Sequence, residues 1–143
     1  MAELRYDEFL SNLGPSVRPI GYLYHGDNFS TGETTTAHFD ELKTIINNDV
    51  NPIGVASGGI HQCNLCQFDG PIGKSIDIWI PHGSTMFVCP SLITHYIAAH
   101  RFLPPSDFLD AVLACPDMQS MEYKKAFLAA GGSEIRKLIS AQM

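Results

Sequence analysis

The spacing of apolar positions predicts a helix, a strand and a second helix in the first third of the chain. Residues 3–13 carry Leu and Phe at a loosely helical spacing, and Gly14-Pro15 is a typical helix stop. Residues 19–24 are aromatic and β-branched over a short span, which is typical of a strand. A polar stretch over residues 25–36 predicts a long loop. Residues 39–46 repeat apolar side chains every three or four positions, as an amphipathic helix does.

The second half of the chain predicts a β-hairpin followed by helices. Residues 76–80 alternate as a strand does, Pro81-His82-Gly83 reads as a turn, and residues 85–88 form a second strand at hairpin distance. Helices are then expected over residues 92–102 with Ser91 as N-cap, from Ser106 through Leu113, over residues 121–130, and from Ser133 onward. We therefore expect one α+β domain over residues 1–143, with a small sheet, a ββα unit and a helical C-terminal half.

Composition narrows the classes of protein that fit this pattern. The 143 residues are 45% hydrophobic and 17% charged, which is enough apolar material for one packed core. The formal net charge of −6 argues against a protein whose main task is to neutralise phosphates. No apolar run reaches the roughly 18 residues that a membrane span needs, and the opening residues lack the hydrophobic stretch of a signal peptide. These features predict a cytoplasmic protein.

Two pairs of metal-ligand residues give the strongest chemical signal. Cys63 and Cys66 are spaced so that one tight turn can present both thiolates to an ion. His95 and His100 follow on a predicted helix, five positions apart, which separates them by about 140° in an α-helix. We therefore expect the helix to tighten or bend at the second histidine. Together the four residues predict a Cys2His2 zinc site.

Other histidines and cysteines compete for this role. His61 stands two residues before Cys63, and Cys89 directly precedes the helix of His95, so either could replace one ligand. Cys89 and Cys115 are otherwise expected to be small buried side chains. A redox dithiol is the second interpretation of the Cys-x-x-Cys pair, but the turn sequence after Cys66 does not suit a thiolate at a helix N-terminus.

Residues 63–100 resemble a Cys2His2 zinc finger, with thiolates on a turn before a hairpin and imidazoles on the helix after it. The 28 residues between the pairs exceed the about 12 of the DNA-reading finger, so the resemblance supports a metal site more than DNA binding. The run from His61 to Cys66 and residues 94–108 also resemble a small group of uncharacterised bacterial proteins, to which no activity is attached.

The predicted zinc is structural rather than catalytic. Four protein ligands close a tetrahedral site, and two thiolates weaken zinc as a Lewis acid. Neither ligand pair has an adjacent carboxylate to act as general base. The glutamate of the zinc deaminase motif is replaced by Gln62. We assign no catalytic residue and expect a non-enzymatic, zinc-stabilised protein that binds another protein. The alternatives are a zinc hydrolase with an open metal position and, third, a nucleic-acid-binding finger.

Two further groups of residues were candidates for binding. In the polar loop, three side chains could line a small pocket together with two preceding tyrosines: His25, Asp27, Glu33, Tyr22 and Tyr24. The loop has no lysine, so a phosphate-binding loop is not indicated. Four cations on the predicted C-terminal helices could form a local basic patch: Lys124, Lys125, Arg136 and Lys137. The other interpretation of the loop is a solvated connector.

Overall fold

The computed structural model describes residues 5–48, 62–66, 70–73 and 77–141. These residues form six helices and a three-stranded sheet, which confirms the predicted α+β class. In chain order the elements are α1 (Tyr6–Ser11), β1 (Val17–Pro19), α2 (Thr36–Asn47), β2 (Asp77–His82), β3 (Thr85–Pro90), α3 (Ile93–His100), α4 (Ser106–Ala114), α5 (Met121–Ala129) and α6 (Gly132–Ala141).

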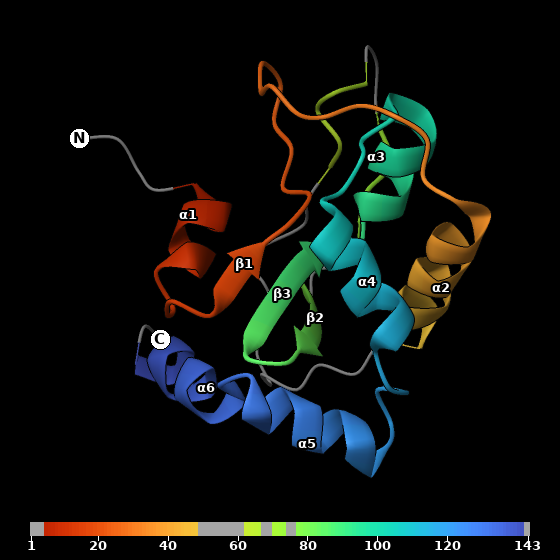
Figure 1. Ribbon diagram of the computed structural model, residues 1–143. Coiled ribbons are helices and arrows are strands. Elements are labelled where there is room, and N and C mark those ends of the chain that lie inside the picture. Colours follow the sequence, from red (N-terminus) through yellow and green to blue (C-terminus); the bar gives the residue numbers. More distant parts are fainter. Residues whose placement is uncertain (1–4, 49–61, 67–69, 74–76, 142–143) are drawn as a thin grey trace.

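The sheet has the strand order β1-β3-β2 and occupies the centre of the molecule (Figure 1). β2 and β3 form the predicted antiparallel hairpin, and β1 pairs in parallel with β3. The predicted strand over residues 19–24 is therefore mostly wrong, because only Val17–Pro19 pair. The chain leaves the sheet after Ile20, whose amide still donates to the Val88 carbonyl at 2.8 Å, and Gly21 follows with φ +82°.

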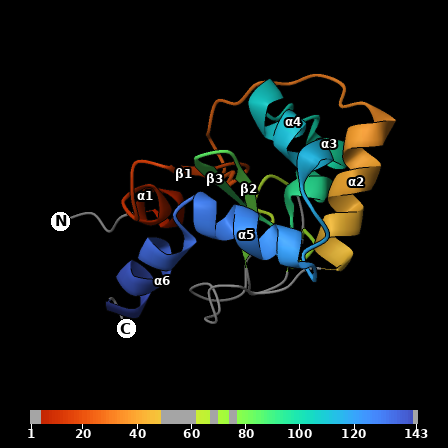
Figure 2. The same ribbon diagram turned by 60° about the horizontal axis from the view of Figure 1, so that its bottom comes forward.

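The helices cover the sheet from several sides. α2, α3 and α4 gather on one side in both views, α1 lies beside β1, and α5 runs past the sheet toward α6 (Figures 1 and 2). α4 and α5 both pack on β2. Phe87 of β3 meets Phe108 of α4 edge to face, with ring centroids 5.6 Å apart. Both rings are fully buried, so the hairpin contributes a large part of the core.

The observed bounds of several helices and strands differ from the predicted ones. β2 continues through Pro81 and His82, so the hairpin turn is Gly83-Ser84 rather than residues 81–83. Proline is tolerated there because β2 is an edge strand. α3 is shorter than the predicted 92–102, and Leu92 rather than Ser91 is its N-cap, without a side-chain bond. α6 begins at Gly132 instead of Ser133.

The packing of α5 against α6 requires glycine at position 132. A Cβ atom there would lie 2.1 Å from the Phe127 ring, so the close approach of α5 and α6 requires the missing side chain. The two C-terminal helices are therefore joined by a short, close turn at Ala130-Gly131, where Gly131 has φ +95°.

Candidate metal centre

The two cysteines lie on a turn that is held by its own backbone. The Cys63 amide donates to the Pro71 carbonyl at 3.1 Å, and Gln62 forms an antiparallel bridge with Ile72. The Gln62 side-chain amide adds a 2.9 Å bond to the Gly70 carbonyl. Residues 62–66 and 70–73 thus lie side by side, and this pairing presents Cys63 and Cys66 together. We call these two segments the cysteine turn.

The histidines come from α3, whose last turn is wider than an α-helical turn. The backbone amides of Arg101 and Phe102 both donate to the carbonyl of Tyr96, five and six residues earlier. An i to i−5 bond of this kind is characteristic of a π-type turn. It adds a residue to the turn, so His95 and His100 can face the same side although they are five positions apart. The adjustment is therefore a widening of the last turn, where the sequence predicted that the helix tightens or bends.

The structure brings the four predicted ligands into one cluster. Cys66 Sγ lies 3.4 Å from His95 Nε2 and 3.5 Å from His100 Nε2, and Cys63 Sγ lies 3.5 Å from the same His100 nitrogen. All four donor atoms are within 4.8 Å of one another. Among the described residues this is the one such group of His, Cys and carboxylate side chains, and it could hold a metal ion.

The cluster is partly withdrawn from water. Cys63 is buried, while Cys66, His95 and His100 are each half-buried. Burial lowers the pKa of His95, and the neighbouring His100 lowers it further. Burial and the neighbouring Cys63 raise the pKa of the Cys66 thiol. A bound cation would lower the pKa of the Cys66 thiol again, because it stabilises the thiolate. It would also bind the neutral form of His95, which the site already favours.

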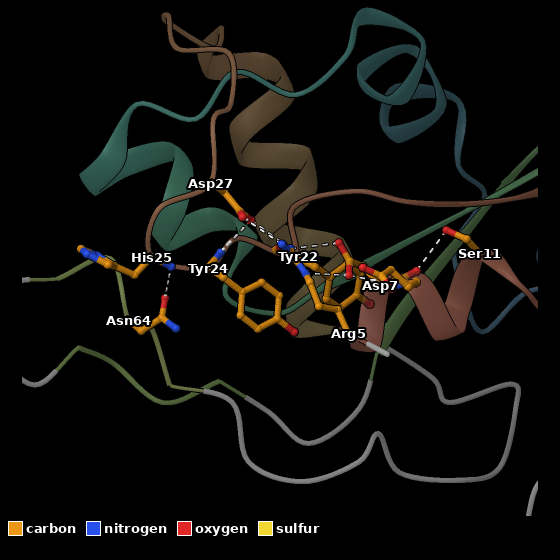
Figure 3. A network of polar contacts seen from close by, with 9 residues as sticks. Arg5, Asp7, Ser11, Tyr22, Tyr24, His25, Asp27 and Asn64 are labelled. Carbon is orange, nitrogen blue, oxygen red and sulfur yellow. Dashed lines mark hydrogen bonds and ion pairs between the residues drawn. The ribbon is translucent and has the colours of Figure 1, made fainter. Parts of the chain in front are cut away.

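Neighbouring residues fix the cysteine turn against the rest of the fold. A Cβ atom at Gly73 would lie 2.8 Å from the Leu92 side chain, so this end of the turn packs closely on the start of α3. On the other side, the His25 amide donates to Asn64 Oδ1 at 2.9 Å (Figure 3). The turn is thus attached both to the histidine helix and to the polar loop after residue 24.

An arginine-centred network continues from that loop to α1. Arg5 donates to both carboxylate oxygens of Asp27 at 2.8 and 2.9 Å and to both of Asp7 at 3.1 and 3.2 Å. It also donates to the Tyr22 carbonyl and lies over the Tyr24 ring, 4.1 Å from its centroid (Figure 3). The network lowers the pKa of Asp27, mainly through its bonds with Arg5. Sequence reasoning missed it, because Arg5 and Asp7 lie far along the chain from residues 22–27.

The competing ligands do not join the cluster within the described residues. Cys89 is buried in the core, and this burial raises its pKa well above the usual thiol range. Cys115 is half-buried beyond α4, where burial raises its pKa to about 12. Cys89 therefore fits the expected buried role, while Cys115 is only partly buried against the core. His61 lies outside the described residues.

The polar-loop candidates do not share one pocket. Tyr22 and Asp27 line a groove of about 300 Å³ beside α1, together with Arg5. Glu33 lines a different groove, of about 350 Å³, between the loop and α3. Tyr22 and Asp27 therefore share a groove as expected, but Glu33 does not join them, because Asp27 is held beside Arg5 while Glu33 lies beside α3.

The four C-terminal cations are exposed on α5 and α6. Arg136 lies over the Phe127 ring, and Lys137 is 3.6 Å from Glu134. Two of the four cations, Arg136 and Lys137, therefore make ordinary surface contacts within α5 and α6.

Comparison with protein families gives one match. Residues 2–113 match a family described as "Domain of unknown function (DUF7919)". The chain belongs to this family. The matched DUF7919 region contains both ligand pairs and ends before α5 and α6. Neither the curated proteins nor the solved structures include a significant match to the chain. Among the described residues no helix combines the length and apolar character that a membrane span requires.

Proposed function

We propose that Cys63, Cys66, His95 and His100 hold a structural Zn²⁺ ion. The observation that carries this proposal is the match between the cluster and a zinc tetrahedron. With Zn–S bonds of about 2.3 Å and Zn–N bonds of about 2.0–2.1 Å, the sulfur-to-nitrogen edge of a tetrahedron is about 3.5 Å. Three of the four sulfur-to-nitrogen distances are 3.4, 3.5 and 3.5 Å, and all four donor atoms lie within 4.8 Å of one another. A tetrahedral set of two sulfurs and two nitrogens is the environment that zinc prefers among common metals.

The ion would add a strong link between the cysteine turn and α3, which otherwise meet where Gly73 packs on Leu92. The cysteine turn is short, and its two described segments bury one side chain, Cys63. Zinc would join this turn to α3, with an apparent binding free energy of about 10–16 kcal/mol by analogy with small zinc domains. Because four protein donors fill a tetrahedral shell, the ion would have no position for a substrate water. This supports a non-enzymatic role.

The role we propose is that of a protein-interaction module stabilised by zinc. Ile72, opposite Gln62 in the cysteine turn, is 64% exposed and is one of the most exposed large apolar side chains in the described structure. A rigid turn that presents an apolar side chain beside an acidic body suits a protein partner. If so, Ile72→Asp should abolish partner retention while metal content stays the same, and Ile72→Val should preserve both.

Metal analysis of the purified chain tests the zinc site. We expect one zinc per chain, and Co²⁺ substitution should give the intense visible absorption of a tetrahedral thiolate site. Cys66→Ser and His95→Asn should lose the ion, whereas the matched changes Cys115→Ser and His82→Asn should retain it. Removal of the ion by a chelator should lower the melting temperature. An unchanged melting temperature after verified metal loss would contradict a structural role, and an exchangeable water on the metal would favour the hydrolase alternative.

A further inference from the structure

The groove lined by Glu33 lies between the polar loop and the helix pair α2 and α3. It has a volume of about 350 Å³, within the range of small-molecule sites. Its apolar lining consists of Phe39 on α2 with Ile97 and Ala98 on α3. None of the four metal-cluster residues lines it, so the groove is a separate feature.

One residue that lines this groove carries a hydroxyl group without a partner. Thr34 lines the groove, and its Oγ1 atom is shielded from solvent but makes no hydrogen bond. It is the one buried side-chain oxygen or nitrogen without a partner in the described part of the chain. Such a group costs about 1–3 kcal/mol unless something bonds to it. A ligand in the groove would remove that cost if the Thr34 side chain turned its hydroxyl from this shielded position toward the ligand.

Two opposite charges face the same space without pairing. Arg101 and Glu33 both line the groove, and neither forms an ion pair with the other or with another described residue. The position of Arg101 is fixed, because it ends α3 with φ 55° and its carbonyl accepts the Gly32 amide at 3.0 Å. Thr36, the first residue of α2, also lines the groove, and the positive end of this helix favours a negative group nearby.

We propose that this groove binds a free α-amino acid with an apolar side chain. Such a molecule carries a carboxylate, an ammonium group and an apolar group on one carbon, and the groove offers a counterpart to each. Arg101 would receive the carboxylate, and the Thr34 hydroxyl, once turned toward the groove, would donate beside it. Glu33 would receive the ammonium group. Phe39, Ile97 and Ala98 would cover the side chain.

The lining excludes simpler ligands. A plain anion such as phosphate would gain from Arg101 but would be repelled by Glu33 and would leave the apolar lining unused. A purely apolar ligand would leave both charges and the Thr34 hydroxyl without new partners. The combination of charges is therefore more specific than any one of them.

The proposal is tested by titrating the full, metal-loaded chain with L-leucine. Binding is monitored through the NMR shifts of the backbone amides. We expect saturable shifts at Thr34, Phe39 and Arg101 with a Kd of about 1 mM or tighter. Three probes each remove one group: leucinamide lacks the carboxylate, N-acetylleucine lacks the ammonium charge, and glycine lacks the side chain. Each should bind at least about tenfold more weakly, because each loses one favourable contact.

Three substitutions identify the residues responsible. Arg101→Gln and Glu33→Gln should each weaken L-leucine binding about tenfold or more, and Lys125→Gln and Glu122→Gln, which remove exposed charges on α5, should leave it unchanged. Thr34→Val should weaken binding without lowering the melting temperature, because the free protein gains nothing from an unpaired hydroxyl. If Arg101→Gln does not fold, Arg101→Gly removes the same charge at a backbone position that glycine tolerates.

Several outcomes would overturn the proposal. These are the absence of saturable shifts up to about 10 mM L-leucine, equal binding of N-acetylleucine or of inorganic phosphate, and shifts that map away from the groove. None of them would bear on the zinc site, whose test is metal content.

Discussion

Gly70 lies so close to the carbonyl of Cys63 that a Cβ atom there would sit 2.5 Å from the oxygen. It would also lie 2.9 Å from the Cys63 Cβ atom, so an alanine would push directly on a member of the metal cluster. The shape of the cysteine turn thus depends on a residue that binds nothing itself.

Gly70→Ala should therefore impair the metal cluster. The backbone must shift to relieve the contact, and this displaces the Cys63 sulfur from its partners. We expect at least tenfold weaker zinc binding, about 1.4 kcal/mol, measured by competition with a chelating dye. Gly83→Ala in the β2–β3 turn is a useful comparison, because a Cβ atom there meets nothing within 4 Å. Equal zinc affinity in the wild type and Gly70→Ala would show that the turn accommodates the methyl group.

The Arg5–Asp27 pair should make stability depend on pH in the acid range. Because Arg5 lowers the pKa of Asp27 in the folded chain, the folded carboxylate binds a proton less readily than the unfolded one. Its contribution is present above the ordinary Asp pKa of about 4 and is lost as the pH falls through the lowered value. Asp27→Asn should remove this part of the acid dependence and cost about 1 kcal/mol near neutral pH, a value kept small by solvent screening. Urea unfolding at several pH values measures both effects.

Asp40→Asn serves as the control for that experiment, because Asp40 is an exposed residue of α2 that forms no ion pair with the described part of the chain. If Asp27→Asn and Asp40→Asn gave the same pH profile, the Arg5 network would have no measurable role in stability.

The hydrogen bond between Tyr22 and Asp77 should contribute to the stability of the folded chain. Tyr22 is buried and donates to Asp77 at 2.6 Å, and Tyr6 also donates to the same carboxylate. Tyr22→Phe removes one bond to a buried carboxylate and should cost about 1.5–3 kcal/mol in the free energy of unfolding. The denaturant midpoint should fall while the slope of the transition stays constant. Burial raises the pKa of Tyr22, so its contribution should be present below pH 10 and decline above it.

The attachment of α5 can be tested through Tyr123. Its hydroxyl donates to the Trp79 carbonyl of β2 at 2.6 Å, and both side chains are buried. Tyr123→Phe keeps the ring but leaves that carbonyl without this donor, which should cost about 1 kcal/mol. Hydrogen exchange should then be faster in α5 and α6 but unchanged in α2 and α3. Uniform acceleration throughout the chain would instead indicate that α5 unfolds only together with the rest.

The sequence predicted the metal cluster better than its setting. The spacing of Cys63 with Cys66, and of His95 with His100, depends on local geometry that a short stretch of sequence determines. The widened last turn of α3 could not be predicted in the same way, because it is set by the left-handed backbone at Arg101 and by the contacts of the following loop. Local spacing thus identified the donors, and tertiary contacts determined how the helix presents them.

In the polar loop, by contrast, local sequence did not predict which residues lie together. Asp27 and Glu33 are six residues apart and look equivalent in the sequence, but the structure places them in different grooves. The difference arises because Arg5, which lies far away in the sequence, pairs with Asp27. Likewise residues 20–24 have strand-like composition, but Tyr22 turns into the core to reach Asp77. Long-range partners of this kind leave no periodic signal.

The position of α5 beside β2 has a consequence for association between copies. An uncovered edge strand exposes backbone groups that can pair with another molecule, and this is a common origin of aggregation. Here α5 packs on the edge strand, and a tyrosine occupies one of its outward carbonyls. This cover comes from residues after position 113, outside the region that matches the family. A chain shortened to that region would expose the strand and should form intermolecular sheets more readily.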